Sequence, residues 1–227
     1  MGYKFLENFA DVKRRAEKNL APFAVLIAKK LNVDKICIVG GAVRDAVLAA
    51  YANENFHVKD FDVICYAPPK LSNNENILSV QKNSFGGDKI NLRDIGMVDS
   101  FQFYTPNPAN VIAQYFDFNC NSLFFHNGKI QMLPEFVDFM RHKTITVCNA
   151  NLGLPEHFVV RAVKFKIVFN SLFGLNASLD EKLLCDLRGF TSLQMETVKD
   201  YAHRKIKQPE ILNSVLDFCS RVRSVSL

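Results

Sequence analysis

The chain has 227 residues, 48% of them hydrophobic and 22% charged, which is typical of a folded globular protein, and its net charge of +5 permits an anionic partner without requiring one. The six cysteines form no Cys-x-x-Cys motif, which argues against a zinc site. No apolar run approaches the roughly 18 residues of a membrane helix, so we expect a cytoplasmic protein without a membrane contact.

The first half of the chain alternates predicted helices with short strands. Hydrophobic periodicity and Gly/Pro signals predict helices over residues 5–31 and 42–51, strands over 35–39, 60–66 and 89–95, and a loop over 67–87. Pro22 is expected to break the first helix.

The second half changes from strands to helices. Short strands are predicted around residues 101–104 and 122–125, a hairpin at Asn127-Gly128, and helices over 155–170, 180–189, 193–206 and 209–223. We therefore predict an α+β head domain over residues 1–153 and a small all-helical region over residues 154–227.

The sequence Asp60-Phe61-Asp62 opens a predicted strand. Residues i and i+2 of a strand point to the same face, so both carboxylates project together while Phe61 points into the core. Mg²⁺ is bound by one or two carboxylates together with substrate phosphate oxygens, and two such ions can serve a phosphoryl-type transfer. The pair therefore predicts a magnesium site, although a solvated strand edge has the same pattern.

The Gly40-Gly41 pair lies between a predicted strand and a predicted helix. Free backbone N–H groups at a helix N-terminus can bind phosphate, and glycine lets the backbone approach closely. A simple tight turn would use the same residues.

In combination these segments resemble a known signature. The chain has a hydrophobic strand, Gly40-Gly41, two further residues, Arg44-Asp45, a helix, and then Lys59 before the carboxylate pair. This order is similar to that of the class II nucleotidyltransferases, the CCA-adding tRNA nucleotidyltransferases and bacterial poly(A) polymerases. The resemblance implies a polymerase beta-like head with a mixed sheet flanked by helices, followed by a helical neck.

Weaker similarities extend the resemblance over roughly residues 35–170. They lie in the segments Asp117–Leu123, Glu135–Ile145 and Arg161–Phe165. The resemblance implies that Asp117 and Arg161 contact the nucleotide, Asp117 through a ribose hydroxyl.

The resemblance also implies roles for the stronger motif. Asp60 and Asp62 would bind two Mg²⁺ ions, and Gly40 and Gly41 would hold the nucleoside triphosphate (NTP). Arg44 and Asp45 either contact phosphate and position the helix or form a structural ion pair.

A third carboxylate on a neighbouring strand is common in the superfamily. Asp94 is the candidate in this chain, where it would orient the attacking hydroxyl, and Asp88 and Asp99 are its rivals.

The chain departs from the family pattern at the substrate-contacting positions. An Arg pair of the family is replaced by Tyr115 and Phe116, which would either stack on a base or belong to the core. The neck positions that select CTP and ATP are Leu154, Pro155 and Phe158, which cannot make polar base contacts. We also expect most of the tRNA-gripping body and tail to be missing from this chain.

Three hypotheses follow. The leading one is an NTP-dependent nucleotidyltransferase that releases pyrophosphate and acts on an RNA or tRNA 3′ end. The second keeps the reaction but replaces the acceptor by a protein or a small molecule, as in a toxin-like or modifying enzyme. The third is a degenerate module that binds nucleotide or RNA without catalysis. The sequence does not determine the oligomeric state.

Overall fold

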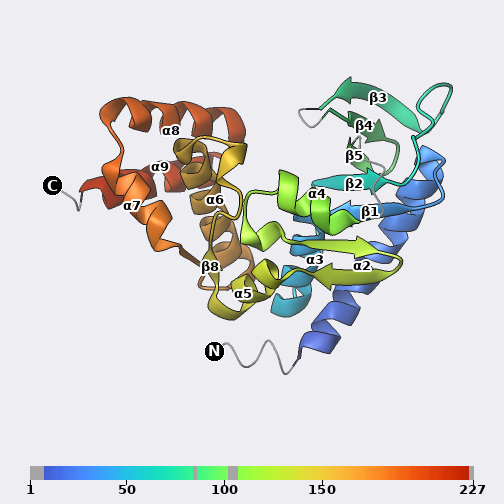
Figure 1. The fold of residues 1–227 in the computed structure, drawn as a ribbon, viewed down its shortest axis with the longest axis horizontal. Coiled ribbons are helices and arrows are strands. Elements are labelled where there is room, and N and C mark those ends of the chain that lie inside the picture. The colour runs from blue at the N-terminus through green and yellow to red at the C-terminus, as the bar shows by residue number, and fades with distance from the viewer. Residues whose placement is uncertain (1–7, 84–85, 102–106, 225–227) are drawn as a thin grey trace. The chain divides into compact units, whose positions relative to one another are not determined.

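The computed structural model describes residues 8–83, 86–101 and 107–224 (Figure 1). The chain folds into two compact units. The first unit, the head, comprises Met1–Phe116 and Cys120–Val137, and the second, the helical unit, comprises Asp117–Asn119 and Asp138–Leu227. The domain boundary at residues 153 and 154 stays a prediction.

The helices and strands follow the labels of Figure 1. The α-helices are α2 (Phe9–Leu31), α3 (Gly41–Ala52), α4 (Pro108–Tyr115), α5 (Pro134–His142), α6 (Pro155–Phe173), α7 (Glu181–Gly189), α8 (Ser192–Lys205) and α9 (Pro209–Ser224). The strands are β1 (Ile36–Val39), β2 (Asp60–Cys65), β3 (Ile77–Lys82), β4 (Asp88–Leu92), β5 (Gly96–Phe101), β6 (Leu123–His126), β7 (Lys129–Met132), β8 (Thr144–Ile145) and β9 (Ser178–Leu179). Two short 3₁₀ helices are η1 (Asn119–Asn121) and η2 (Ala150–Leu152).

The head is built on a seven-stranded sheet with the order β3-β4-β5-β2-β1-β6-β7. Strands β2 and β5 pair in parallel, whereas the other neighbours are antiparallel. The sheet is therefore mixed, as predicted for an α+β head. In the helical unit, β8 and β9 form a separate two-stranded parallel sheet.

The side chains of β2 alternate between the two faces of the sheet. Phe61 is 2% exposed, and its ring lies 5.0 Å from that of Phe23 in α2. On the opposite face, Ile64 joins an apolar cluster with Val111 and Ile112 of α4. Because side chains alternate along a strand, Asp60 and Asp62 share the face of Ile64 rather than that of Phe61.

Local signals placed several elements correctly. The Asn127-Gly128 hairpin between β6 and β7 is confirmed, and both residues have positive φ, at 49° and 75°. The helices predicted after residue 154 are confirmed as α6 to α9, and Pro155 and Pro209 are the first residues of α6 and α9.

Other predictions were wrong. Helix α2 continues through Pro22, because its apolar residues, among them Leu20 and Ile27, are fully buried and hold the helix together. The predicted loop over residues 67–87 contains edge strand β3, which exposes Leu78 and Val80 and therefore lacks a clear alternation.

Two further helices, α4 and α5, were not predicted. The signal for α4 is local, because the Asn107 side chain accepts a hydrogen bond from the Ala109 N–H and Pro108 opens the helix. Of the strand predicted around residues 101–104, Phe101 belongs to β5, and residues 102–104 lie outside the described residues.

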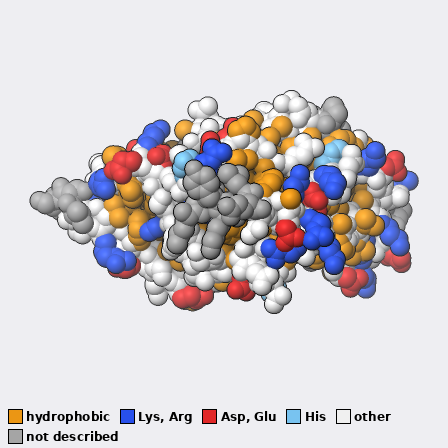
Figure 2. Space-filling model, turned by 90° about the horizontal axis from the view of Figure 1, so that it is seen from below, with side chains coloured by type: hydrophobic (Ala, Val, Ile, Leu, Met, Phe, Trp, Pro, Cys, Tyr) orange, Lys and Arg blue, Asp and Glu red, His pale blue; other side chains and the backbone are white. Residues whose placement is uncertain are grey.

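Charged side chains of both signs are interspersed on the face shown in Figure 2. Several basic side chains of α2 form ion pairs, such as Arg14 with Asp11 and Lys13 with Glu17. The basic N-terminal segment is thus partly neutralised within its own helix. No helix in the described part of the chain is both long and apolar enough to cross a membrane.

The continuous helix α2 generates a stability prediction. Pro22 is exposed and cannot donate a hydrogen bond to the carbonyl group of Lys18. Pro22→Ala should therefore raise the free energy of unfolding by about 1–3 kcal/mol in urea titrations. Lys18→Ala, on the same helix, is the control and should change it by less than about 0.5 kcal/mol. A lower unfolding free energy for Pro22→Ala would contradict the prediction.

Candidate functional site

The turn between β1 and α3 places Gly40 against a carboxylate. Gly40 has φ of 67°, which favours glycine. A Cβ atom at Gly40 would lie 2.5 Å from Cε1 of Phe116 and 2.9 Å from Oδ2 of Asp62. Only glycine therefore fits, and the backbone of the turn touches both side chains. Because Gly41 is the first residue of α3, the free N–H groups of the helix begin at this turn.

The two predicted carboxylates lie together on the sheet. Asp60 is exposed and Asp62 is half-buried, and both lie within the first three residues of β2. Asp62 is opposite Val39 of β1 on one side and opposite Asp99 of β5 on the other. The structure thus brings Gly40 and Asp62 into one site, because Gly40 follows Val39 directly.

Like charges accumulate around Asp62. Burial, together with the carboxylates of Asp60 and Asp99, raises the pKa of Asp62 to about 7. The cations of Arg44 and Lys89 oppose this shift. The arrangement therefore has an excess of negative charge that a bound cation would relieve.

The structure places Asp99, rather than Asp94, beside the pair, and the role of either carboxylate in orienting a hydroxyl stays a prediction. Asp94 lies on the turn between β4 and β5 with φ of 64°, and its carboxylate is 3.3 Å from the ammonium of Lys30. Its side chain is 74% exposed. The parallel pairing of β2 with β5 brings Asp99 next to Asp62 instead.

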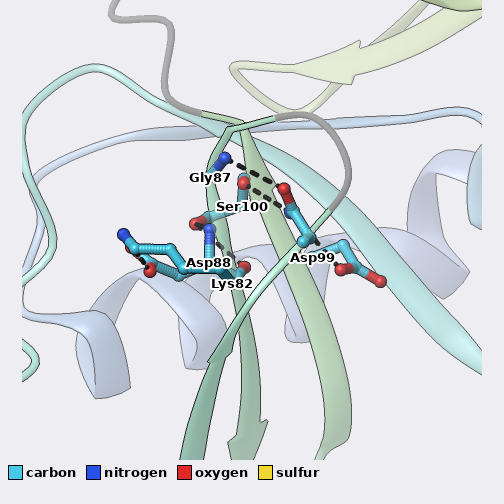
Figure 3. A network of polar contacts seen from close by, with 6 residues as sticks. Lys82, Gly87, Asp88, Asp99 and Ser100 are labelled. Atoms are coloured by element: carbon cyan, nitrogen blue, oxygen red, sulfur yellow. Dashed lines mark hydrogen bonds and ion pairs between the residues drawn. The ribbon is translucent and has the colours of Figure 1, made fainter.

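A polar network holds Asp99 in place (Figure 3). Nδ2 of Asn83 donates to Oδ1 of Asp99 at 3.4 Å and to the carbonyl oxygen of Ser100 at 3.0 Å. Oδ1 of Asn83 accepts from the N–H of Gly87 at 2.9 Å. On the other carboxylate oxygen, the ammonium of Lys89 lies 3.5 Å from Oδ2. Sequence analysis did not identify Asn83 or Lys89.

Asp88, the other rival, belongs to the opposite face of the sheet. It pairs across strands with Ser100, which in turn pairs with Val63 rather than with Asp62. Its carboxylate binds the ammonium of Lys82 at 2.7 Å. Asp88 therefore does not belong to the cluster of carboxylates around Asp62.

Arg44 and Asp45 form the structural ion pair that was one of the two alternatives. Nε of Arg44 donates to Oδ1 of Asp45 at 2.7 Å, and Nη1 donates to Oδ1 of Asn121 at 2.7 Å. The Arg44 side chain is only 10% exposed. The guanidinium thus joins α3 to η1 close to the Gly40-Gly41 turn.

Tyr115 and Phe116 add an apolar wall to the site. Both are partly buried and pack against the apolar cluster of β1, β2 and α4. The ring of Phe116 lies 6.0 Å from that of Phe101 and contacts the Gly40 turn. Phe116 is therefore fixed beside the carboxylates by core packing.

Asp117 and Arg161 lie in the helical unit, where they form an ion pair. Asp117 is 3% exposed, and burial raises its pKa although Arg161 acts in the opposite direction. The guanidinium of Arg161 also lies over the ring of Phe118, 5.4 Å from its centre. The pair contributes to the packing of α6, and a contact of either residue with nucleotide stays a prediction.

The neck positions bear apolar side chains in the structure as well. Leu154 is the N-cap of α6 and is 54% exposed, and Pro155 is its first residue. Phe158 is 5% exposed and lies 6.1 Å from Phe118, ring to ring.

The carboxylate pair fits magnesium of the substrate-bridging kind. Within residues 8–83, 86–101 and 107–224, no group of three or more His, Cys, Asp and Glu side chains is arranged to hold a metal ion. Mg²⁺ commonly uses only one or two carboxylates and completes its shell with phosphate oxygens and water. Burial first, and then the neighbouring carboxylates of Asp60 and Asp99, raise the pKa of Asp62, and a bound cation would offset both effects. Asp60 and Asp62 are therefore suited to hold Mg²⁺ together with a substrate.

Comparison with solved structures relates this fold to CCA-adding enzymes. A CCA-adding enzyme in complex with ATP matches with a TM-score of 0.55 and 15% identity, over 90% of this chain and 51% of that chain. The Thermotoga maritima CCA-adding enzyme complexed with tRNA matches with a TM-score of 0.55 and 15% identity, over 89% and 51%. An apo CCA-adding enzyme matches with a TM-score of 0.57 and 14% identity, over 93% and 50%.

These matches show a nucleotidyltransferase-like fold, as the sequence predicted. The chain spans about half the length of these neighbours. No protein-family model and no curated protein matches the sequence.

Two glycine substitutions can distinguish the effect of the close contact at Gly40 on stability from the effect of its positive φ. Gly40→Ala adds both the strain of a positive φ and a clash with Asp62 and Phe116. Gly128→Ala is a matched control, because its φ is 75° but nothing lies within 4 Å of the added Cβ. We expect Gly128→Ala to lower the free energy of unfolding by about 1–2 kcal/mol and Gly40→Ala by more. Equal losses in urea titrations would show that the contact at Gly40 is unimportant.

Proposed function

We propose that this protein is a metal-dependent nucleotidyltransferase that transfers a nucleotidyl group from an NTP to a hydroxyl, with an RNA or tRNA 3′ end as the acceptor. The observation that carries the proposal is the close approach of the Gly40 turn to the Asp62 carboxylate, where an added Cβ would lie 2.9 Å from Oδ2. It supports the proposal because a turn suited to phosphate then lies beside a carboxylate pair suited to Mg²⁺, within a nucleotidyltransferase-like fold. The six free cysteines fit the reducing cytoplasm, where we place the reaction.

Different residues of the chain have different roles in the proposed reaction. Backbone N–H groups at the start of α3 bind the triphosphate, and Gly40 permits its approach. Asp60 and Asp62 would hold two Mg²⁺ ions, which would supply positive charge to the triphosphate and to the attacking hydroxyl. Arg44, Asp45 and Asn121 keep the turn in position.

The proposed reaction forms one bond to phosphorus and breaks another. The acceptor oxygen forms a bond to the α-phosphorus of the NTP, and the bond from that phosphorus to the bridging oxygen of the β-phosphate breaks. Pyrophosphate leaves, and the hydroxyl proton passes to solvent.

The choice of acceptor rests on the similar proteins. The neighbours are CCA-adding enzymes, one of them in complex with tRNA, and a further match is a tRNA-processing enzyme complex. The apolar residues Leu154, Pro155 and Phe158 favour a second candidate, a nucleotidyltransferase that modifies a protein or a small molecule, because they supply no polar contact for selecting CTP or ATP.

The metal assignment predicts a loss of activity without a loss of fold. Asp62→Asn should reduce transfer of label from α-labelled NTP by at least about a hundredfold, because metal binding contributes several kcal/mol to such transition states. Asp94→Asn is the matched control and should retain activity, since Asp94 binds Lys30 on an exposed turn. In urea titrations Asp94→Asn should unfold much as the wild type does, and Asp62→Asn should be no less stable, because it removes a charge that burial and the neighbouring carboxylates disfavour.

Either of two outcomes would refute this assignment. A folded Asp62→Asn protein with wild-type turnover would exclude Asp62 as a metal ligand. Loss of transfer in Asp94→Asn but not in Asp62→Asn would instead support Asp94 as a catalytic carboxylate.

The acceptor is tested with separate pools of RNA, protein and small molecules, each incubated with Mg²⁺ and the four α-labelled NTPs. Label in RNA is the expected result, and the nucleotide that labels it is identified at the same time. Label in protein or in small molecules alone would support the second candidate. Binding of NTP that needs no Mg²⁺, with no transfer to any pool, would indicate a binding module instead of an enzyme.

A further inference from the structure

We propose that Lys89 is the cation with which this site binds a phosphate group of its substrate. The inference deepens the proposed function and rests on it for the identity of the substrate. Nothing in the sequence signature assigns a role to Lys89.

Lys89 belongs to a cross-strand row that contains the carboxylate site. Asp62 of β2 is opposite Asp99 of β5, and Asp99 is opposite Lys89 of β4. Directly opposed residues of neighbouring strands share one face of a sheet. Lys89 therefore lies on the face of the carboxylate pair, and its side chain is 40% exposed.

The position of the Lys89 ammonium is fixed through Asp99. Oδ2 of Asp99 lies 3.5 Å from the ammonium, and Oδ1 accepts the hydrogen bond from Asn83. Asn83 is itself held by Gly87 and Ser100 (Figure 3). A carboxylate that is bound at both oxygens holds its cation in a defined direction, which is what a binding site requires.

Arg44, a second cation near Asp62, is already committed to the fold. Arg44 and Lys89 both lower the pKa of Asp62, so both lie within its electrostatic reach. The Arg44 guanidinium is 10% exposed and binds Asp45 and Asn121. The Lys89 side chain is four times as exposed and can therefore meet a substrate.

The chemistry of Lys89 suits a phosphate oxygen. An ammonium has three N–H donors, so Asp99 as an acceptor leaves capacity for an anion. A partly exposed ion pair contributes little to stability and can rearrange around a ligand at small cost. The aromatic residues Tyr115 and Phe116 cannot supply this charge. Phosphate groups of an NTP and of an RNA backbone share the required chemistry.

A second Lys–Asp pair of the same hairpin provides a control. Lys82 binds Asp88 at 2.7 Å, and its side chain is 79% exposed. This pair lies on the opposite face of the sheet, because Asp88 aligns with Ser100 and not with Asp99. Lys82→Met and Lys89→Met remove the same charge and keep a similar apolar stem. The two variants therefore differ mainly in the face of the sheet from which the charge is removed.

The experiment measures binding to the full chain rather than turnover. ATP with Mg²⁺ is titrated by calorimetry, and a short single-stranded RNA is titrated separately by fluorescence anisotropy. Loss of one charged hydrogen bond predicts that Lys89→Met weakens binding of one of these ligands by about tenfold or more. Lys82→Met should bind both within about twofold of the wild type, and Lys89→Arg should recover most of the affinity.

Each outcome decides the proposal. Weaker ATP binding alone assigns Lys89 to the triphosphate, and weaker RNA binding alone assigns it to the acceptor backbone. Wild-type affinity of a folded Lys89→Met protein for both ligands would overturn the proposal, as would equal losses in Lys82→Met or a wild type that binds neither. If binding depends on Lys89 but the wild type transfers no nucleotide, the proposed reaction fails and the phosphate site stands.

Discussion

The contact of Gly40 with the Asp62 carboxylate is the constraint on which the rest of the site depends. It arises from the β1–β2 ladder, in which Val39 lies opposite Asp62 and Gly40 follows at once. A Cβ atom at this point would meet both the carboxylate and the Phe116 ring. A slip of one residue in the ladder would turn Asp62 to the other face, so strand register couples the turn to the carboxylates.

Charge distribution follows from the same register. Three carboxylates meet near the start of β2, and buried Arg44 and partly exposed Lys89 oppose their charge. Arg44 is enclosed and binds Asp45 and Asn121, which suits a group that stabilises the turn, because an isolated buried charge would be costly. Lys89 remains open to solvent. With aromatic rather than cationic residues at 115 and 116, the site has an apolar wall on one side and its accessible positive charge on the other.

Much of the site could be predicted because its signals are local. The alternation in Asp60-Phe61-Asp62 fixes which side chains point outward once a strand forms. Gly40, between a strand and a helix, marks a backbone that must adopt positive φ. The helices that start at Pro155 and Pro209 and the Asn127-Gly128 hairpin are likewise specified by residues within one turn of the feature.

The partners of these residues depended on distant segments. Asp94 and Asp99 both suit a third carboxylate by type and by position in the sequence, and only the parallel pairing of β2 with β5 selects Asp99. Pro22 would end a helix in isolation, yet burial of its neighbours in the head maintains α2. The sequence by itself determined the turn, the carboxylate pair and the four C-terminal helices, since these follow from local backbone preferences. Tertiary structure alone decided which charges meet at the site, because strand register is set by packing between segments far apart in the chain.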